Sequence, residues 1–302
     1  MRYLVNSLLV LCIVSLFSCN LYAQDLDDLL SDLQSEVATS QDVIATFKAT
    51  RVINGHSVEM LAKGDLEFRI AHRFGRLNTG AVDLWGLDLA DNRIGFDYGI
   101  TNWLMTGIGR SSFNNVVDYF LKARITRQQT QPQNLLQHFS INWYSNVMLD
   151  GRPNPLGSWT EDIDQRFSYA HQLIIAKKIN DRFSLQITPT AIYESYVPTA
   201  EDQNLRFALG TAGRVKLTNR VAITAEHFLR IPFNGSDISP DFQQNNNSFS
   251  VGFDIETGGH VFQLHFTNSR SMVERGFIQQ TNGTWANNDI HFGFNITRNF
   301  TL

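Results

Sequence analysis

The chain has very little cysteine, and it has no long apolar run beyond its first two dozen residues. Its two cysteines, Cys12 and Cys19, both lie in that leading stretch of a 302-residue sequence. The remainder can therefore form no disulfide, thiolate metal site or thiol nucleophile. No later apolar run approaches the roughly 20 residues that a membrane helix needs. A net charge of −4 gives no indication of nucleic-acid binding.

The first 23 residues have the pattern of a secretory signal peptide. Arg2 supplies the positive charge, residues 8–17 are an apolar core, and cleavage after Ala23 would start the mature chain at Gln24. An alternative is a lipoprotein signal in which Cys19 is acylated. Both interpretations predict export.

From about residue 62 onward the sequence alternates between apolar and polar residues, as strands with one face in lipid and one in water do. The last of these strands carries Phe294 and, near the terminus, Phe300, and we expect both to belong to the signal that the barrel-assembly machinery reads. Its polar side comprises His291, Gly293, Asn295 and Thr297. Pro189 lies within another strand and predicts a bulge or a strand end there, because it lacks a ladder donor.

About twelve such strands fit between residues 62 and 300, and their connections alternate in length. Short connections are expected near residues 101–102, 180–181, 218–219 and 258–259, and long ones near 75–92, 150–165, 195–204, 231–247 and 271–288. Short turns at one rim and long loops at the other are typical of bacterial outer-membrane barrels. We therefore predict an all-β fold: a single antiparallel transmembrane β-barrel of about 12 strands over residues 61–302, with membrane lipid around it.

Residues 24–60 precede the barrel. Residues 24–40 are acidic with leucines at helical spacing, which predicts a short solvated amphipathic helix in the periplasm. The alternative is a helix that docks on a periplasmic protein. Residues 43–58 alternate like a strand, but a thirteenth wall strand would close poorly. We expect them to be a plug segment in the lumen or across its periplasmic mouth, with a wall strand as the alternative.

Four runs carry a resemblance to a known family: Thr46–Glu59, Gly64–Gly75, Arg93–Leu104 and Gly107–Ser112. They resemble a bacteroidete outer-membrane β-barrel family catalogued as a domain of unknown function (DUF5777). The resemblance implies an outer-membrane barrel in a Gram-negative cell. It implies no established substrate, cofactor or reaction, so no catalytic residue is carried over.

The polar faces of the strands supply the candidate site residues. Mixed charges there would either cross-link the interior through ion pairs or form a selectivity-setting lining, as charged rings do in channels. Three residues of the N-terminal stretch are candidates for anchoring a plug: Arg51, His56 and Glu59. The candidates for lining the lumen are Glu67, Arg69, Arg73, Arg93, Asp97, Asp118, Lys122, Arg124, Arg206, Arg214, Glu226, Asp254 and Glu256.

The sequence gives little evidence for an enzyme active site or a metal site. The histidines are dispersed, and the three expected to face inward, His138, His265 and His291, lie on separate strands without metal-ligand spacing. Ser111 and Ser112 lie near a rim without an identifiable catalytic partner. We expect no enzyme and no cofactor. The working function is a passive channel or uptake pore for small solutes, and the alternative is a plugged, non-conducting barrel that serves as a scaffold for a periplasmic or surface partner.

Overall fold

A computed structural model describes residues 40–152, 163–197, 199–232 and 239–302. The predicted signal peptide and most of the predicted acidic helix lie outside the described residues. Residues Gln41–Leu302 form one compact unit.

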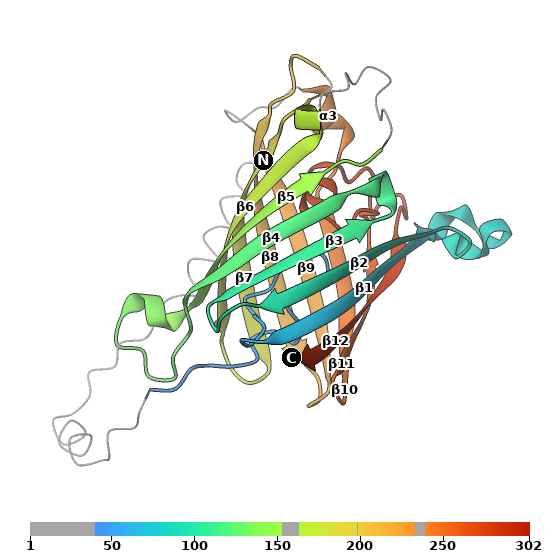
Figure 1. Cartoon of the computed structure of the whole chain (residues 1–302). Helices are drawn as coiled ribbons and strands as arrows, with labels where there is room; N and C mark the ends of the chain where they lie inside the picture. The colour runs from blue at the N-terminus through green and yellow to red at the C-terminus, as the bar shows by residue number, and fades with distance from the viewer. Residues whose placement is uncertain (1–39, 153–162, 198, 233–238) are drawn as a thin grey trace, which may run out of the picture. The chain divides into compact units, whose positions relative to one another are not determined.

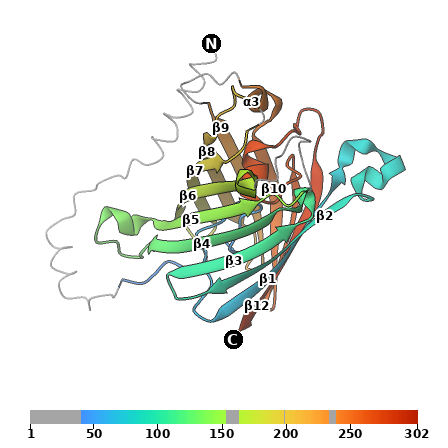
Figure 2. The same cartoon turned by 45° about the horizontal axis from the view of Figure 1, so that its top comes forward.

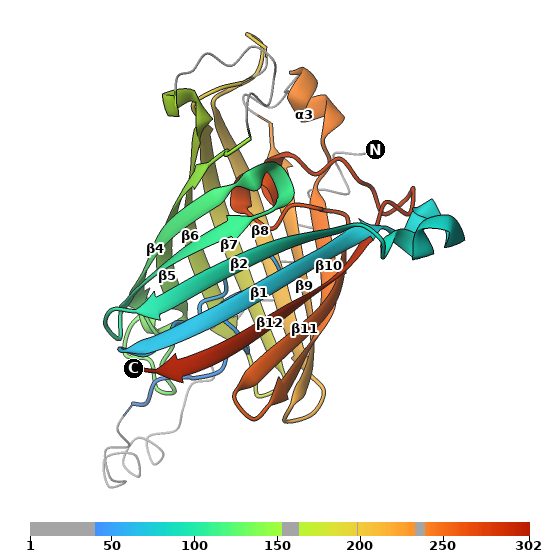
Figure 3. The ribbon, with the colours of Figure 1, turned by 45° about the vertical axis from the view of Figure 1, so that its right-hand side comes forward.

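The described residues form twelve antiparallel strands in a closed barrel, which confirms the predicted fold class. Each strand pairs with its sequence neighbours, and β1 also pairs with β12, so the ring closes where the barrel begins and ends (Figures 1 and 3). The strands are β1 (Asp65–Arg76), β2 (Ala90–Gly99), β3 (Leu104–Ser111), β4 (Val117–Thr126), β5 (Ser140–Leu149), β6 (Phe167–Lys178), β7 (Phe183–Glu194), β8 (Leu205–Lys216), β9 (Val221–Ile231), β10 (Ser248–Thr257), β11 (His260–Thr267) and β12 (His291–Thr301).

Alternation along each strand decides which side chains face lipid. In β2, the side chain of Phe96 is 47% exposed on the outer face, while that of its neighbour Asp97 is 0% exposed on the inner face. In β12, Phe294 faces outward and stacks on His72 of β1 with ring centroids 4.9 Å apart, while Asn295 faces inward. Apolar residues outside and polar residues inside are the arrangement of a membrane barrel.

The two rims differ as predicted, with one exception at each rim. Short turns follow β2, β6, β8 and β10, and the termini of the barrel lie at the same rim. The β4–β5 connection at this rim is longer and contains the 3₁₀ turn η4 (Leu135–His138). The prediction that His138 faces inward from a strand is therefore wrong, because a turn begins three residues before it.

The other rim carries the long connections and one short connection, residues 112–116 between β3 and β4. The short connection contains the 3₁₀ turn η3 (Phe113–Asn115). The long ones contain the 3₁₀ turns η1 (Leu77–Thr79), η2 (Ala81–Gly86) and η5 (Ile163–Arg166), the helix α3 (Pro240–Gln244) and the π-helical turn η7 (Arg275–Gln279). Among the described residues, no helix has the length and apolarity to cross a membrane.

Pro189 causes neither a bulge nor a strand end, so that prediction is wrong. β7 runs unbroken from Phe183 to Glu194, and Pro189 pairs with Leu209 of β8. On its other side, the β6–β7 ladder lacks pairs opposite Pro189 but resumes in the same register. The missing N–H of Pro189 thus removes pairing with β6 only locally, and the pairs on either side keep the two strands in register.

Two chain segments fill the interior. Residues 46–61, called the N-terminal insert, precede β1 and lie inside the barrel toward the short-turn rim (Figure 1). Residues 268–281, called the outer insert, follow β11 and fold inside the ring from the long-loop end (Figure 2). Neither segment is a wall strand, so residues 43–58 do not make a thirteenth strand.

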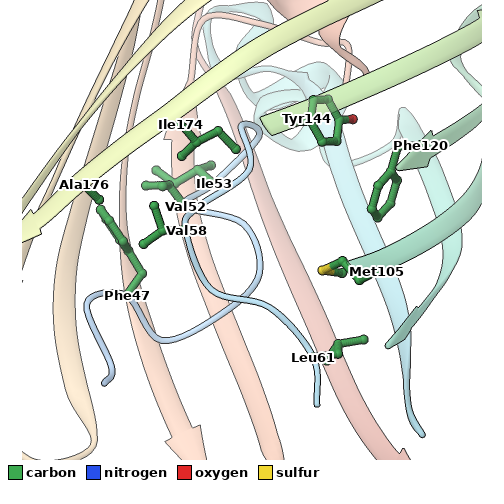
Figure 4. Close-up of a cluster of buried hydrophobic side chains, with 10 residues drawn as sticks. All are labelled: Phe47, Val52, Ile53, Val58, Leu61, Met105, Phe120, Tyr144, Ile174 and Ala176. Carbon is green, nitrogen blue, oxygen red and sulfur yellow. The ribbon is translucent and has the colours of Figure 1, made fainter. Parts of the chain in front are cut away.

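Each insert has an apolar contact with the wall. Phe47, Val52, Ile53, Val58 and Leu61 of the N-terminal insert pack against the inward-facing Met105, Phe120, Tyr144, Ile174 and Ala176 (Figure 4). Val273, Phe277 and Ile278 of the outer insert pack against Val116, Met148, Ala170, Ile192, Ala208 and Phe228. The interior therefore has two apolar cores within a polar wall, which the alternation pattern did not predict.

Glycines on the inner wall make room for large charged side chains. A β-carbon at Gly109 would overlap Nη2 of Arg93, and one at Gly293 would overlap Nη1 of Arg73. The two guanidinium groups thus lie flat against a neighbouring strand. This close approach explains glycines that interrupt otherwise regular strands.

We expect Gly109→Ala to lower the free energy of unfolding by about 1–3 kcal/mol, because overpacking displaces Arg93 from its carboxylate partner. The matched control is Gly213→Ala, whose β-carbon would lie an ordinary 3.5 Å from Leu185 Cδ2. The measurement is urea unfolding in lipid vesicles, followed by tryptophan fluorescence. Equal unfolding midpoints for the two variants would contradict the role assigned to Gly109.

Candidate functional site

The structure places most of the candidate lumen residues on the inner wall, buried beneath the inserts. Arg124 and Glu256 also point inward but lie at the short-turn rim, where Arg124 donates to the carbonyl of Asn102 and Glu256 pairs with Lys48 of the N-terminal insert. The buried members are Glu67, Arg69, Arg73, Arg93, Asp97, Asp118, Lys122, Arg206, Arg214, Glu226 and Asp254.

Two ion pairs lie on the wall between β1 and β4. Arg93 donates from Nε and Nη2 to the two carboxylate oxygens of Asp118, at 2.9 and 2.5 Å. Arg69 donates from Nη2 to Glu67 Oε1 at 2.5 Å, and the same carboxylate oxygen accepts from Thr50 of the N-terminal insert at 2.9 Å. Bidentate pairing is the strongest arrangement for a buried guanidinium, so Arg93 and Asp118 stabilise one another despite losing water.

Glu226 of β9 holds the tip of the N-terminal insert. The insert turns back on itself where Val52 N–H donates to the carbonyl of Gly55 at 2.8 Å. At this turn the backbone N–H groups of Ile53, Asn54 and Gly55 donate to the Glu226 carboxylate at 3.2, 2.8 and 3.0 Å. Three donors from successive residues make a concave anion cradle, here occupied by a wall side chain.

Wall side chains also bind the carbonyl groups of the N-terminal insert. Lys122 Nζ donates to the carbonyl of Glu59 at 2.6 Å, and Arg214 Nη1 donates to that of Thr46 at 3.3 Å. Side-chain amides from four further strands do the same: Asn142 to Val58, Gln186 to His56, Gln263 to Val52 and Asn295 to Ile53, at 2.8–2.9 Å. The insert is thus held by side chains from around the barrel rather than by a strand ladder.

The three candidate anchors do not bind the wall through ion pairs. Arg51 reaches Glu274 of the outer insert at 3.5 Å and the carbonyl of Asn54 at 3.2 Å, so its carboxylate partner is not on the wall. His56 packs on the rings of Phe120 and Tyr144. Glu59 accepts from Phe47 N–H within the insert at 3.0 Å.

The outer insert brings in charged residues that the sequence did not single out. The Glu274 carboxylate accepts from Tyr144 Oη at 2.9 Å and from Asn146 Nδ2 at 2.6 Å. Arg275 pairs with Glu194 at 2.7 Å and with Asp150 at 3.3 Å. Burial alone would lower the pKa of Arg275, but these two carboxylates more than offset it and raise that pKa above its ordinary value. Four apolar residues in one long loop, Met272, Val273, Phe277 and Ile278, were the sequence signal that this loop is buried.

The two inserts meet inside the barrel. Besides the contact between Arg51 and Glu274, both inserts line a small cavity of about 10 Å³, with Met272 from the outer insert and Asn54 from the N-terminal insert. That volume holds about one water molecule.

Among the described residues, one hydrogen bond joins a serine hydroxyl to a histidine ring, and it lies on the outer wall. Ser145 Oγ lies 3.0 Å from His171 Nδ1 across the β5–β6 pair. In the described part of the chain no carboxylate bonds to this histidine, and the surrounding backbone N–H groups belong to the ladder. Ser112 accepts from Asn92 N–H. These residues do not assemble the parts of a hydrolytic site.

We expect Glu226→Ala to free the tip of the N-terminal insert, because three buried N–H groups lose a charged acceptor, and hydrogen bonds of this kind contribute about 1.5–3 kcal/mol each. In a chain produced from Gln24 and refolded into lipid, Ser57→Cys supplies the sole thiol at a position that is 0% exposed. Its labelling by a membrane-impermeant maleimide should accelerate at least about tenfold in the Glu226→Ala background.

The matched control is Glu256→Ala. Glu256 also binds the insert, but its partly exposed pair with Lys48 is of a kind that contributes about 0–1 kcal/mol. Equal labelling rates in the two backgrounds would show that Glu226 does not hold the insert.

Solved structures similar to the chain include two porins and an enzyme. The NanC porin is 9% identical with a TM-score of 0.48, over 78% of this chain and 100% of that one. The KdgM porin is 9% identical with a TM-score of 0.44, over 78% of this chain and 99% of the KdgM chain. Outer membrane phospholipase A from Escherichia coli is 9% identical with a TM-score of 0.45, over 86% and 100%. Such distant similarity transfers no activity to the chain. No curated protein sequence matches it.

A family model gives the firmer result. The model described as "Membrane bound beta barrel domain (DUF5777)" matches residues 47–300, which covers the N-terminal insert together with all but the edge of the barrel. The closed ring, the apolar outer face and the alternation of short turns with long loops agree with that description. The chain belongs to the membrane bound beta barrel domain family (DUF5777) and is a β-barrel of the outer membrane.

Proposed function

We propose that the chain is a channel for small polar solutes whose resting state is closed by its two inserts in series. The observation that carries this proposal is that the barrel closes without the N-terminal insert. β1 pairs with both β2 and β12 along its length, while the insert contributes no ladder to the wall. The insert can therefore leave the lumen without opening the barrel.

The wall beneath the insert supports a water-filled open state. Its inner face presents the charged residues Lys122, Arg214, Glu226 and Asp254, together with the side-chain amides that bind the insert. Water can replace each of these hydrogen bonds when the insert departs, so no polar group of the wall is left without a partner in the open state. Mixed charges would then line the lumen and influence which solutes pass.

The insert also has a direct way out. Residues 41–44 run along the short-turn rim, where Val43 N–H donates to the carbonyl of Gln128 at 2.7 Å and Asp42 bridges to Gln129. Short turns mark the periplasmic side of such barrels. Withdrawal toward the periplasm therefore requires no rearrangement of the long loops.

The second candidate function is a permanently filled barrel that serves as a scaffold for a periplasmic or surface partner. It is favoured by the apolar contact between the N-terminal insert and the wall (Figure 4), because a withdrawn insert would expose Phe47, Val52 and Ile53 together with the wall side chains Phe120 and Ile174. Measuring ion conductance in planar bilayers distinguishes the channel from the scaffold.

We expect the unaltered chain to be silent in planar bilayers at most times, because both inserts occupy the lumen. A chain that begins at residue 62 should show partial conductance, since the outer insert still narrows the lumen. Replacing residues 269–281 with a short glycine-serine linker in that same chain should give steady, large single-channel currents.

The control for each variant is proof of a folded barrel, through β-sheet circular dichroism and an electrophoretic mobility that changes on boiling. A folded barrel that lacks both inserts and still conducts no ions would contradict the channel function. The scaffold function would then be the remaining candidate.

A further inference from the structure

Four arginines converge on the small cavity between the two inserts. Arg51 comes from the N-terminal insert, Arg69 and Arg73 from β1, and Arg93 from β2. All four side chains are buried, and no acidic residue lines the cavity with them. Like charges gathered away from water repel one another strongly unless carboxylates or another anion balance them.

Carboxylates balance three of the four. Arg93 is bound by Asp118, Arg69 by Glu67, and Arg51 lies 3.5 Å from Glu274. Asp97 lies close by on the wall, buried and without a hydrogen-bond donor to its carboxylate.

Arg73 is different, because in the described part of the chain it forms no ion pair. Its one hydrogen bond goes from Nη2 to the amide oxygen of Asn54, at 2.6 Å.

Several guanidinium nitrogens around the cavity have no acceptor. They are Nε of Arg51, Nε and Nη1 of Arg69, and Nε and Nη1 of Arg73. Each is buried, and a buried donor without an acceptor is costly, the more so on a charged group. Donors of this kind around one cavity indicate a ligand that accepts hydrogen bonds.

We propose that this cavity binds one small monovalent anion of halide size, with Arg73 as its principal partner and Arg51 and Arg69 as additional donors. A volume of about 10 Å³ admits a single small particle and excludes sulfate, phosphate or a carboxylate. A water molecule would accept some of these bonds but carries no charge, and the two carboxylates that act on Arg73 from a distance, Glu226 and Asp91, bind other groups. Chloride accepts from several donors and places a negative charge directly beside Arg73.

The anion would join the N-terminal insert to the wall. Arg51 and Asn54 belong to the insert and Arg73 belongs to β1, so a bound ion adds contacts that exist only while the insert is in place. A ligand that binds only this state stabilises it in proportion to its concentration. The site does not depend on whether the barrel conducts.

Two measurements test the site on the refolded full-length barrel. In crystals grown in sodium bromide, we expect an anomalous bromide peak within hydrogen-bonding distance of the Arg73 guanidinium. In solution, we expect urea to unfold the barrel at a higher midpoint in sodium chloride than in sodium gluconate at equal ionic strength.

The variant Arg73→Gln should lose the difference between chloride and gluconate. The matched control is Arg206→Gln, which removes a buried wall arginine that pairs with Glu194 and Asp241 away from this cavity, and it should keep the difference. A bromide crystal with only water beside Arg73 would overturn the proposal, and so would a chloride effect that survives in Arg73→Gln. Should that variant fail to fold, the bromide crystal of the unaltered chain decides.

Discussion

Charged side chains enclosed within the barrel are the constraint on which the rest of this structure depends. The inner wall carries arginines, a lysine and carboxylates that would face water in an empty barrel, and with the inserts in place these side chains are buried. An ion taken out of water must be paired or hydrogen-bonded, because the cost of leaving it bare is several kcal/mol. Some of these charges pair with each other on the wall, as Arg93 does with Asp118. Others bind the N-terminal insert, as the Glu226 carboxylate does when it accepts from the backbone N–H of Asn54.

The inserts and the wall therefore depend on one another. The N-terminal insert brings backbone groups that bind the side-chain amides and charges of the wall, and the outer insert brings Glu274 and Arg275 to the carboxylate, amide and hydroxyl groups that remain. Between these polar contacts, two apolar cores fix each insert against a different set of strands. Gly109 and Gly293 leave room for the guanidinium groups of Arg93 and Arg73 against the neighbouring strands.

Much of the fold could be predicted from the sequence, because in a membrane barrel the period of two decides both the strand and the side of each residue. The alternation around Phe96 and Asp97, or Phe294 and Asn295, is enough to place them on opposite faces. Periodicity fails where the chain leaves the wall. The alternation predicts His138 in a strand, but His138 lies in a 3₁₀ turn. It also predicts a bulge or a strand end at Pro189, but pairing with β6 and β8 keeps β7 in register although Pro189 lacks a backbone N–H. The outer insert has no period, and the pairing of Arg51 with Glu274, 223 residues apart, follows from three-dimensional packing alone.

The turn of the N-terminal insert is docked inside the barrel on Glu226, and this contact is the central claim. Hydrogen exchange of the Ile53, Asn54 and Gly55 amides in the lipid-embedded protein tests it most directly, because amides bonded to a buried carboxylate exchange only when the insert opens. We predict that these three amides are protected to a degree comparable with strand amides. Exchange as fast as that of an unfolded peptide would contradict the docking.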